Sequence, residues 1–436
     1  MSASSSRFGI LAAVAVVSLA SIQASGNPLD MFGAGAANIA MGGTGTATAD
    51  SYEAAYYNPA ALGLAERVEF GAGASVYRPW LEARFNSYDP VGKVTSPVSG
   101  RRFDRAQAFL EAGVVAPIPL GKDLGRHLFF GLHVYSPADV VYSVVAREAT
   151  EPAFPLYEDR NRRLVLNAAL SGRYKWLMFG LGISVLPTVR GTVRMDLADT
   201  SLQDYLGIDV GFAVSPNAGL LFEPIDGLTL GIAYRAAGKT RIELPVDAAV
   251  TEVPVFLTVN AATFWTPHQV SFGIGWKGKN YRVAGDVVFS MFSGFQMASP
   301  NLNLFKDSGR DQVSSSGTVV DAGFRDTASV RLGGEFRPIK PVALRAGFSW
   351  TQSPLSAQSG ITNMLGGDQF GGSFGIGFDA AEVGGPHIKV DAYFMAAAVI
   401  DNTDSKLELM PSNPGYPSIG GGGWFLNSGL SIRFGF

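Results

Sequence analysis

Short segments in which apolar residues alternate with polar or small ones recur over most of the chain. Residues 228–235 read LTLGIAYR, and residues 330–337 read VRLGGEFR. Because successive side chains of a β-strand point to opposite faces, each segment predicts a strand with one apolar face. The other face carries both signs of charge, as at Arg331 and Glu335. This pattern is typical of a transmembrane β-barrel, whereas a soluble sandwich turns its charged faces to water around one shared core.

The pattern predicts an all-β fold, an antiparallel transmembrane barrel of about 14 strands. Residues 277–280 and 338–341 read as tight turns, whereas residues 298–327 and 401–422 are long and rich in Gly, Ser, Asn and Pro. Short turns at one end and long loops at the other are typical of outer-membrane barrels. The predicted strands begin near Val68, Gln107, Leu128, Arg163, Leu177, Asp209, Leu228, Phe256, Tyr281, Ala328, Val342, Gly372, His387 and Gly423.

Composition narrows the class of protein further. Charged residues make up 16% of the 436 residues, below the usual ~25%, while Gly (53) and Phe (29) are frequent. Outside the extreme N-terminus the sequence has no run of 18 apolar residues, which argues against a helical membrane protein. The formal net charge of -3 gives no reason to expect nucleic acid as a partner, and the lack of cysteine excludes disulfides and thiolate metal sites.

The N-terminus has the features of a secretory signal peptide. Arg7 supplies a positive charge, residues 8–20 are apolar, and residues 22–24 form an acceptable cleavage site. The alternative is a single membrane-anchor helix, but the apolar run is short and no stop-transfer sequence flanks it. We therefore expect residues 1–24 to be removed and the mature chain to begin near Ser25.

Residues 25–64 differ from the rest of the chain. They are dense in Gly and Ala, carry few charges and show no sustained period of 2 or 3.6 residues. Such a segment has too few large apolar side chains to fold alone, but its small residues let the backbone pack against a surrounding wall. We predict that residues 25–64 form a hatch, or plug, inside a barrel made by residues 65–436.

Two further features point to the bacterial outer membrane. The chain ends in LSIRFGF, and a terminal aromatic residue, Phe436, resembles the signal recognised by the barrel-assembly machinery. Amphipathic rings favour the headgroup level of a membrane, which predicts two aromatic girdles. The tryptophans near predicted strand ends or loop edges are Trp80, Trp176, Trp276, Trp350 and Trp424.

The plug and several strands carry motifs that occur in the same order in a known family. The hatch motif consists of Gly42, Gly43, Gly45, Asp50, Asn58, Pro59 and Ala60. Further along, residues 227–235 and 331–335 are similar to the seventh and tenth strands of that family. Residues 266–268 open a segment like its eighth strand, and residues 353–354 follow the segment like its eleventh. The ordered set covers nearly the whole mature chain and resembles the outer-membrane long-chain fatty acid transporters, the FadL type, which includes aromatic-hydrocarbon transporters.

The resemblance implies a 14-stranded, mostly monomeric barrel that is occluded by its hatch and passes hydrophobic molecules. It also implies a kink in the third strand, through which ligand leaves sideways into the bilayer. Because proline has no N–H to give to a ladder, Pro137 independently predicts a break there. We expect the lateral opening at Ser136 and Pro137, the alternative being that Pro137 only starts an extracellular loop. Residues 193–209 are shorter than the loop that helps to form the family's outer capture groove.

The ligand is expected to bind inside the barrel. Leu29, Met31 and Phe32 are candidates to line an apolar pocket, the alternative being that they only pack the plug. Arg331 and Arg345 are candidates to bind a carboxylate, unless they pair with lumen-facing acids and brace the interior. Transfer of a long acyl chain to water costs about 10 kcal/mol, at roughly 0.8 kcal/mol per CH₂, so an apolar pocket with a side exit avoids a large barrier.

No catalytic or cofactor site is expected. Residues 371–375 read GGSFG and fit the G-x-S-x-G pattern, but a nucleophile elbow needs a strand-to-helix turn and this segment continues into a strand. The four histidines lack metal-ligand spacing.

The sequence therefore predicts a passive outer-membrane transporter of hydrophobic small molecules, with long-chain fatty acids as the first choice of ligand. Its expected steps are binding in the barrel, hatch movement and lateral exit at the third strand. The alternatives are a general porin or structural barrel with a static plug, and a lipid hydrolase that uses Ser373. The expected partners are a fatty acid or hydrocarbon ligand, outer-membrane lipid and lipopolysaccharide, and the barrel-assembly machinery during biogenesis; the protein is expected to be a monomer.

Overall fold

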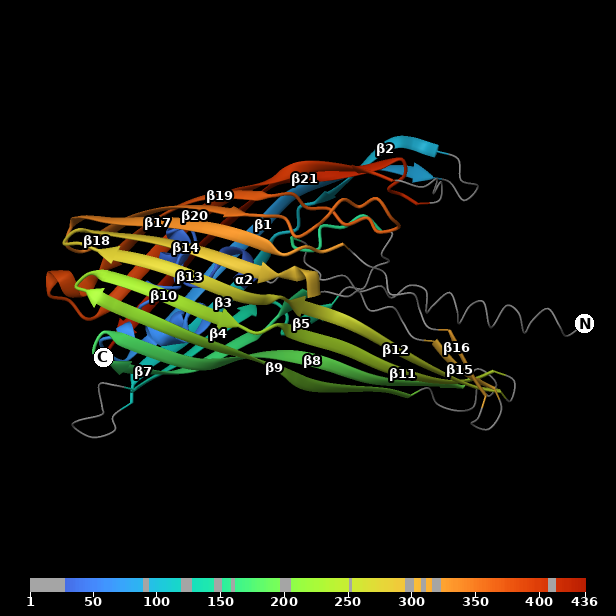
Figure 1. Cartoon of the computed structure of the whole chain (residues 1–436), viewed down its shortest axis with the longest axis horizontal. Helices are drawn as coiled ribbons and strands as arrows, with labels where there is room; N and C mark the ends of the chain where they lie inside the picture. Colours follow the sequence, from blue (N-terminus) through green and yellow to red (C-terminus); the bar gives the residue numbers. More distant parts are fainter. Residues whose placement is uncertain are drawn as a thin grey trace, which may run out of the picture.

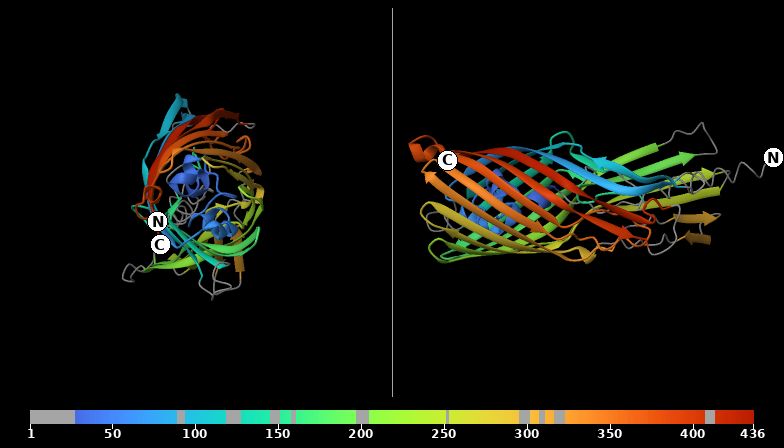
Figure 2. Two further views of the ribbon diagram at one scale, coloured as in Figure 1. Left: turned by 90° about the vertical axis from the view of Figure 1, so that its left-hand side faces the viewer. Right: turned by 90° about the horizontal axis from the view of Figure 1, so that it is seen from above.

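The computed structural model describes residues 28–88, 94–118, 128–144, 151–157, 161–196, 205–250, 253–294, 302–306, 311–315, 323–406 and 413–436. The predicted signal peptide, residues 1–24, and the first three residues of the predicted hatch lie outside these ranges. Within them, 14 antiparallel strands form a closed barrel (Figures 1 and 2). In order round the ring they are β1 (Glu69–Tyr88), β3 (Gln107–Pro117), β4 (Leu128–Pro137), β7 (Val165–Tyr174), β8 (Leu177–Asp196), β9 (Tyr205–Ile225), β10 (Leu228–Arg235), β13 (His268–Lys277), β14 (Tyr281–Met291), β17 (Thr327–Ile339), β18 (Val342–Thr351), β19 (Gln369–Asp379), β20 (Ile388–Ser405) and β21 (Ser418–Gly435).

The ring closes where the first and last strands pair. β1 pairs with β3 on one edge and with β21 on the other, from Glu69↔Gly435 to Arg84↔Gly420. Because lipid offers no hydrogen-bond partners, a sheet can span a membrane only when every strand has two neighbours. The remaining elements outside the plug are β2 (Val94–Phe103), β5 (Tyr142–Val144), β6 (Asn161–Arg163), β11 (Gly238–Val250), β12 (Val253–Thr266), β15 (Leu302–Lys306), β16 (Asp311–Ser315), η2 (Phe292–Gly294) and η3 (Ala380–Val383).

The apolar side chains face outwards and the charged ones face the lumen. On the outer face Leu181 and Phe374 are 69% and 61% exposed, whereas on the inner face Asp391 and Arg345 are 2% and 7% exposed. This is the reverse of a soluble protein, in which charged residues are almost never fully buried. The predicted alternation of lipid-facing and lumen-facing residues is thereby confirmed.

The plug lies inside the ring as four short helical segments, drawn in blue at the centre of the ring in Figure 2 (left). Gly and Ala predominate in these segments, and almost every residue from Leu29 to Gly63 is buried. Among the described helices none is long and apolar enough to cross a membrane. The segments are α2 (Pro28–Phe32), α3 (Ala36–Ala40), α4 (Ala54–Tyr57) and η1 (Pro59–Leu64).

The predicted start of the eighth strand, near Phe256, is wrong. Phe256 belongs to β12, which forms a hairpin with β11, and the eighth strand of the ring is β13. Residues 253–266 are rich in apolar and β-branched types, so they do form a strand. Propensity, however, does not specify which neighbours a strand has, and β10 pairs directly with β13 from Leu228↔Trp276. The other predicted starts agree with the observed ones within about five residues.

The long connections lie at the end opposite the short turns. There β2, β11, β12, β15 and β16 extend from the barrel, while η3 and the C-terminus mark the end with short turns (Figure 1). β20 continues to Ser405 and β21 begins at Ser418, so both ends of the predicted loop 401–422 are strand. One of these extensions, β11, also pairs in parallel with the end of β8, from Val246↔Val193 to Ala249↔Asp196. Beyond the membrane, water can satisfy a strand edge that has no partner.

Two of these connections are joined by backbone hydrogen bonds. The Ala153 N–H donates to the Asn363 carbonyl at 3.1 Å, and the Leu365 N–H donates to the Ala153 carbonyl at 2.7 Å. Phe154 is fully buried beside them. Residues 151–157 and 363–365 therefore pack together on the long-loop side of the plug.

Replacing Leu332 by arginine tests which face meets lipid. Leu332 is a lipid-facing residue near the middle of β17 and 52% exposed. An arginine there should lower the free energy of unfolding by about 2–4 kcal/mol, because a cation near the midplane of the bilayer is poorly solvated. The measurement is equilibrium unfolding in lipid vesicles. The control Val383→Arg lies in η3, outside the ring, and should change stability by less than about 0.5 kcal/mol; equal effects would contradict the assignment.

Candidate transport site

The plug rests directly against glycines of the barrel wall. A Cβ on Gly347 of β18 would lie 1.9 Å from the amide nitrogen of Gly42, and one on Gly333 of β17 would lie 2.3 Å from the carbonyl oxygen of Met41. Gly333 and Gly347 pair across their two strands. Any larger residue would push the plug away from the wall. Three more cross-strand pairs meet the plug in this way, namely Gly231–Gly273, Gly180–Gly219 and Gly71–Gly113.

Two wall side chains hold the glycine-rich turn of the plug. One oxygen of Asp286 accepts hydrogen bonds from the backbone N–H groups of Gly45 at 2.8 Å and Thr46 at 3.0 Å. The hydroxyl of Ser373 accepts from the Gly42 N–H and donates to the Ala40 carbonyl, both at 3.0 Å. Ser373, the residue of the G-x-S-x-G pattern, is thus buried and used to dock the plug.

The Asn-Pro-Ala triplet of the plug has a local structural role. The Asn58 side chain accepts from the Ala60 N–H at 3.0 Å and so caps η1, whose first residue is Pro59. Its amide nitrogen donates to the Thr46 carbonyl within the plug at 2.8 Å and to the Leu220 carbonyl of the wall at 3.1 Å. The cap therefore joins two parts of the plug and ties both to β9.

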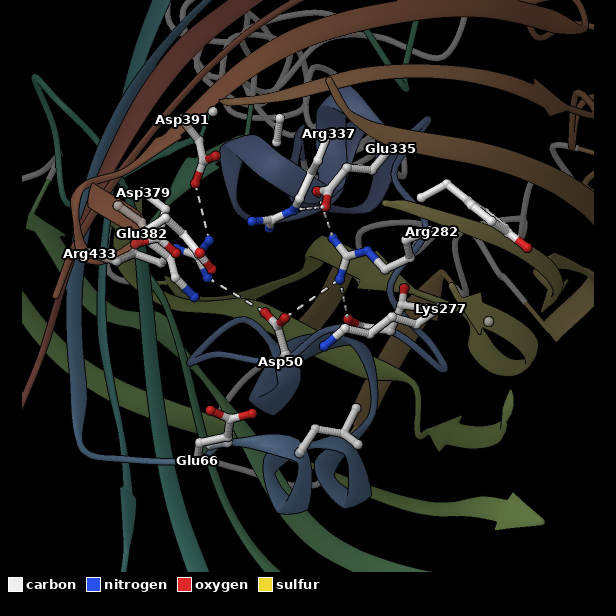
Figure 3. Close-up of a pocket in the computed structure, with 18 of the residues that line it drawn as sticks. Asp50, Glu66, Lys277, Arg282, Glu335, Arg337, Asp379, Glu382, Asp391 and Arg433 are labelled. Carbon is white, nitrogen blue, oxygen red and sulfur yellow. Dashed lines mark hydrogen bonds and ion pairs between the residues drawn. The ribbon is translucent and has the colours of Figure 1, made fainter. Parts of the chain in front are cut away.

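At the end with short turns the lumen contains a chain of ion pairs. Asp50 of the plug lies 3.5 Å from Arg282 and 3.6 Å from Arg433 (Figure 3). Such a chain satisfies the buried charges while linking plug to wall. The wall pairs are Arg282–Glu335 (3.5 Å), Arg337–Glu335 (3.0 Å), Arg345–Glu335 (2.7 Å), Arg345–Asp391 (2.7 Å) and Arg433–Asp391 (3.1 Å).

These ion pairs line a cavity of about 1160 Å³ below the plug. Its wall includes Lys277, Lys279 and Lys389 as well as Asp379 and Glu382 from the short turns and strand ends. Figure 3 shows both signs of charge on all sides of the cavity. The cavity suits water and small ions and offers an apolar molecule little contact.

The environment shifts the pKa of two carboxyl groups of the plug in opposite directions. Partial burial disfavours the charge of Asp50, whose side chain is half exposed to the cavity, but the nearby Arg282 and Arg433 guanidinium groups outweigh this effect and hold the pKa below its ordinary value. Burial raises the pKa of Glu53 to about 8, and the neighbouring Glu111 adds to the rise. Near neutral pH the plug therefore presents a charged Asp50 to the ion pairs and a largely neutral Glu53 to its interior.

The N-terminal helix of the plug packs into an aromatic slot on the other side. Phe32 is 3% exposed, and its ring centroid lies 5.1 Å from that of Tyr77 and 5.3 Å from that of Phe425. Leu29 is buried in the same core, and Met31 packs against it. A residual cavity of about 10 Å³ adjoins Phe32, so the slot is almost filled by the protein itself.

Polar contacts hold this helix at Asp30. The Asp30 carboxylate accepts from Arg235 Nη1 at 2.9 Å and from the Tyr56 hydroxyl at 3.0 Å. The Arg331 side chain donates to the carbonyl oxygens of Gly43 at 3.0 Å and of Asp30 at 3.2 Å. Both arginines come from the barrel wall, so α2 is fastened to β10 and β17.

Of the two arginines predicted from the sequence, Arg331 thus contacts the plug backbone, and Arg345 lies between the Glu335 and Asp391 carboxylates. Arg235 and Asp286 were not among the predicted site residues. Both lie on the polar face of a strand in which apolar and polar residues alternate. That alternation was the sequence signal that could have identified them. Asp30 had no comparable signal, because its partner is 205 residues away.

The third strand of the ring leaves its neighbour at the predicted proline. β4 and β7 pair up to Tyr135↔Val165, and the next backbone hydrogen bond runs from the Leu164 N–H to the Val141 carbonyl at 2.9 Å. The ladder thus skips residues 136–140, which form a bulge. On the other edge β4 still pairs with β3 as far as Phe109↔Pro137, so the interruption lies only between the third and fourth strands.

An ion pair crosses this bulge. Arg162 Nη1 lies 2.6 Å from one oxygen of Asp139 and 2.7 Å from the other. The Arg162 side chain is 8% exposed and that of Asp139 is 54% exposed. Ser136 and Pro137, predicted to mark an opening, lie at the start of the bulge.

A closed barrel with a docked internal plug and an interrupted wall defines a plugged β-barrel transport protein of the outer membrane. The sequence profile described as "Outer membrane protein transport protein (OMPP1/FadL/TodX)" matches residues 168–410, more than half of the chain. The chain belongs to this family. It is a family of transport proteins and not of enzymes.

Relatives with known names agree with this assignment. Alkane uptake protein A of Marinobacter nauticus is 22% identical over 331 residues, which cover 70% of this chain and 68% of that protein. The fold is similar to that of a FadL homologue of Pseudomonas aeruginosa, with a TM-score of 0.64, 14% identity and coverage of 96% of this chain and 100% of that one. It is also similar to the Pseudomonas putida toluene transporter TodX, with a TM-score of 0.57, 15% identity and coverage of 93% and 99%.

Replacing Asp286 by alanine tests the docking of the plug. The change leaves the Gly45 and Thr46 N–H groups without their charged acceptor, and each such bond contributes about 1.5–3 kcal/mol. We expect faster proteolysis within residues 28–64 and a higher ion conductance in planar bilayers. Asp286→Asn keeps an acceptor oxygen and should have a smaller effect; identical behaviour of alanine variant and wild type would contradict the role of Asp286.

Proposed function

We propose that this protein is a passive transporter that binds long-chain hydrophobic molecules, long-chain fatty acids first, and releases them sideways into the outer membrane. Family membership makes hydrophobic small molecules its substrate class. The observation that carries the proposal is the contrast between a closed, charged axis and a wall interrupted at residues 136–140.

The axis of the barrel is a poor route for an apolar molecule. Below the plug it would enter the cavity lined by the ion pairs of Asp50, Arg282 and Arg433. Leaving an apolar site for such a polar, wet space costs roughly 0.8 kcal/mol per CH₂, or about 10 kcal/mol for a long chain. That barrier argues against release through the end with short turns.

The bulge in the third strand supplies a different route. Residues 136–140 have left the β4–β7 ladder, so the wall has fewer interstrand hydrogen bonds to break there than elsewhere. Tyr135 and Phe109 stack beside the bulge, with ring centroids 5.2 Å apart, and give its inner side an apolar lining. A ligand that leaves at Ser136 and Pro137 passes from an aromatic interior to lipid without entering water.

Movement of the hatch is proposed to be local. The glycine-rich turn, Asn58 and Asp50 are fastened to the wall by backbone contacts and ion pairs. The helix α2 is held by the side chains of Arg235 and Arg331 and has only five residues, and it fills the aromatic slot with Leu29 and Phe32. We propose that α2 is the part that leaves, since it covers the apolar slot and a short helix has little stability of its own.

Alkanes are the second candidate substrate class. A protein named for alkane uptake is 22% identical to this chain over most of both lengths. An uncharged hydrocarbon would fit the slot lined by Tyr77 and Phe425 as well as an acyl chain does. The two classes differ in whether a carboxylate is recognised.

The remaining predictions from the sequence are part of this proposal. Residues 1–24 are proposed as a cleaved signal peptide, residues 25–64 as the hatch and residues 65–436 as the barrel. The barrel-assembly machinery is the proposed partner during biogenesis, lipopolysaccharide and lipid surround the barrel, and the protein works as a monomer.

Deleting residues 136–140 tests lateral exit. The deletion joins Tyr135 directly to Val141 and lets β4 and β7 pair without interruption. We expect uptake of labelled palmitate and hexadecane by whole cells to fall about tenfold or more, which corresponds to at least 1.4 kcal/mol of added barrier. A matched deletion of β16, Asp311–Ser315, removes five residues beyond the membrane and should leave uptake unchanged. Normal uptake by a folded variant that lacks the bulge would contradict lateral exit.

Analysis of bound molecules separates the transporter from a porin with a static plug. Protein purified from cells grown with a fatty acid and an alkane should retain one or both, because the slot at Phe32 is apolar and almost closed. Mass spectrometry of organic extracts is the measurement. A porin should retain neither and should conduct ions in planar bilayers without added ligand.

A further inference from the structure

Arg235 and the helix α2 form a contact that resembles a ligand bound in a site. The Asp30 carboxylate is held by Arg235 Nη1 at 2.9 Å and by the Tyr56 hydroxyl at 3.0 Å. The Arg235 guanidinium also lies over the Tyr56 ring, 4.0 Å from its centroid, and donates through Nη2 to the Tyr56 carbonyl at 2.6 Å. The side chains of Arg235 and Asp30 are 16% and 18% exposed.

This pairing does not use the full capacity of the guanidinium group. Arginine binds a carboxylate best through two parallel N–H···O bonds. Asp30 engages only Nη1, and Arg235 Nε is buried without a hydrogen-bond partner. Both hydrogen bonds that Asp30 accepts reach one of its oxygens, Oδ1, so this side chain makes no bidentate pair with the guanidinium group, and an incoming carboxylate competes with a single-point contact.

The same helix also covers the apolar slot. Phe32, two residues after Asp30, packs against the rings of Tyr77 and Phe425, which also contact each other with centroids 5.5 Å apart. A five-residue helix thus presents a carboxylate and an apolar group to two separate receptors, about one helix diameter (~10 Å) apart. Molecules with an acidic head and a hydrocarbon tail have the same two groups.

We infer that Arg235 is the receptor for the carboxylate of an acidic hydrophobic ligand, and that Asp30 occupies it as an internal substitute while the slot is closed. The inference rests on the proposed function and adds the residue that distinguishes fatty acids from alkanes. An incoming fatty acid exchanges its carboxylate for that of Asp30, α2 leaves, and the space vacated by the whole helix, including Leu29 and Phe32, accepts the hydrocarbon tail. An alkane has no carboxylate to replace that of Asp30 at Arg235, so it gains only the apolar contacts of the slot.

Arg235 suits this role better than Arg331, Arg345 and Arg433. Arg345 lies between two carboxylates of the wall, and Arg433 pairs with Asp391 and Asp50 at the end with short turns. Arg331 contacts α2 as well, but it binds backbone carbonyl oxygens, which a ligand carboxylate does not replace. Arg235 alone among these four pairs with an acid that belongs to the N-terminal helix.

The test measures binding of three labelled probes to the full-length protein in lipid nanodiscs, with empty nanodiscs subtracted. The probes are palmitate, its uncharged methyl ester and hexadecane. Wild type is compared with Arg235→Gln, Arg235→Lys and Asp30→Asn. Arg331→Gln is the matched control, because it also frees α2 but removes no carboxylate receptor.

For Arg235→Gln we expect the ratio of palmitate affinity to methyl palmitate affinity to fall about tenfold, equivalent to 1.4 kcal/mol. Hexadecane should bind as in wild type or more tightly, since α2 has lost its ion pair. Arg235→Lys keeps the positive charge but lacks the paired N–H donors of a guanidinium group. Its affinity ratio should therefore lie between those of wild type and Arg235→Gln. Asp30→Asn and Arg331→Gln should raise the affinity for all three probes and leave the ratio of palmitate affinity to methyl palmitate affinity unchanged.

Other outcomes overturn the inference. A loss that is equal for the three probes in Arg235→Gln, or a ratio unchanged in both Arg235 variants, assigns Arg235 a structural role only. If Arg235→Gln does not fold, the ratio of palmitate affinity to methyl palmitate affinity in Arg235→Lys tests the inference instead. If wild type binds none of the probes, the proposed function itself fails, and this result is distinct from binding without discrimination.

Discussion

The structure depends on one constraint, which is that lipid supplies no hydrogen-bond partner to a peptide group. The ladder between β1 and β21 closes the ring and gives every barrel strand two neighbours. Once the ring is closed, the outer face can be apolar without cost, and polar groups must go inside. Leu181 outside and Asp391 inside follow from this constraint rather than from the usual preference for an apolar core.

An interior that collects the polar groups has to satisfy them. Asp391 and Glu335 are buried, and each is paired with arginines from neighbouring strands. The plug completes this system, because Asp50 joins the ion pairs and the amides of its glycine-rich turn bind Asp286. Breaking one partner of such a buried pair is strongly destabilising. The main body of the plug is therefore tied to the wall, and α2, which covers the apolar slot, is the part proposed to move.

Three structural features together support the proposed sideways route of an apolar molecule. The charged cavity makes the axial route costly, the slot around Phe32 offers an apolar site, and the bulge at residues 136–140 interrupts the wall. Each feature has an ordinary structural explanation when taken alone. Their combination in one barrel explains how a protein filled with ion pairs can serve hydrophobic substrates.

The alternation of residues along the chain was sufficient to assign the faces. Because strand geometry has a period of two, it placed Arg331, Glu335 and the outer leucines correctly, and the small residues of the N-terminal segment indicated a plug. Pro137 indicated a break in the third strand, since it lacks an N–H. Partners could not be read in this way: Phe256 was assigned to the ring although its strand pairs outside it, and Asp30 meets Arg235 across 205 residues. Such contacts depend on how the ring closes around the plug, which only the tertiary structure decides.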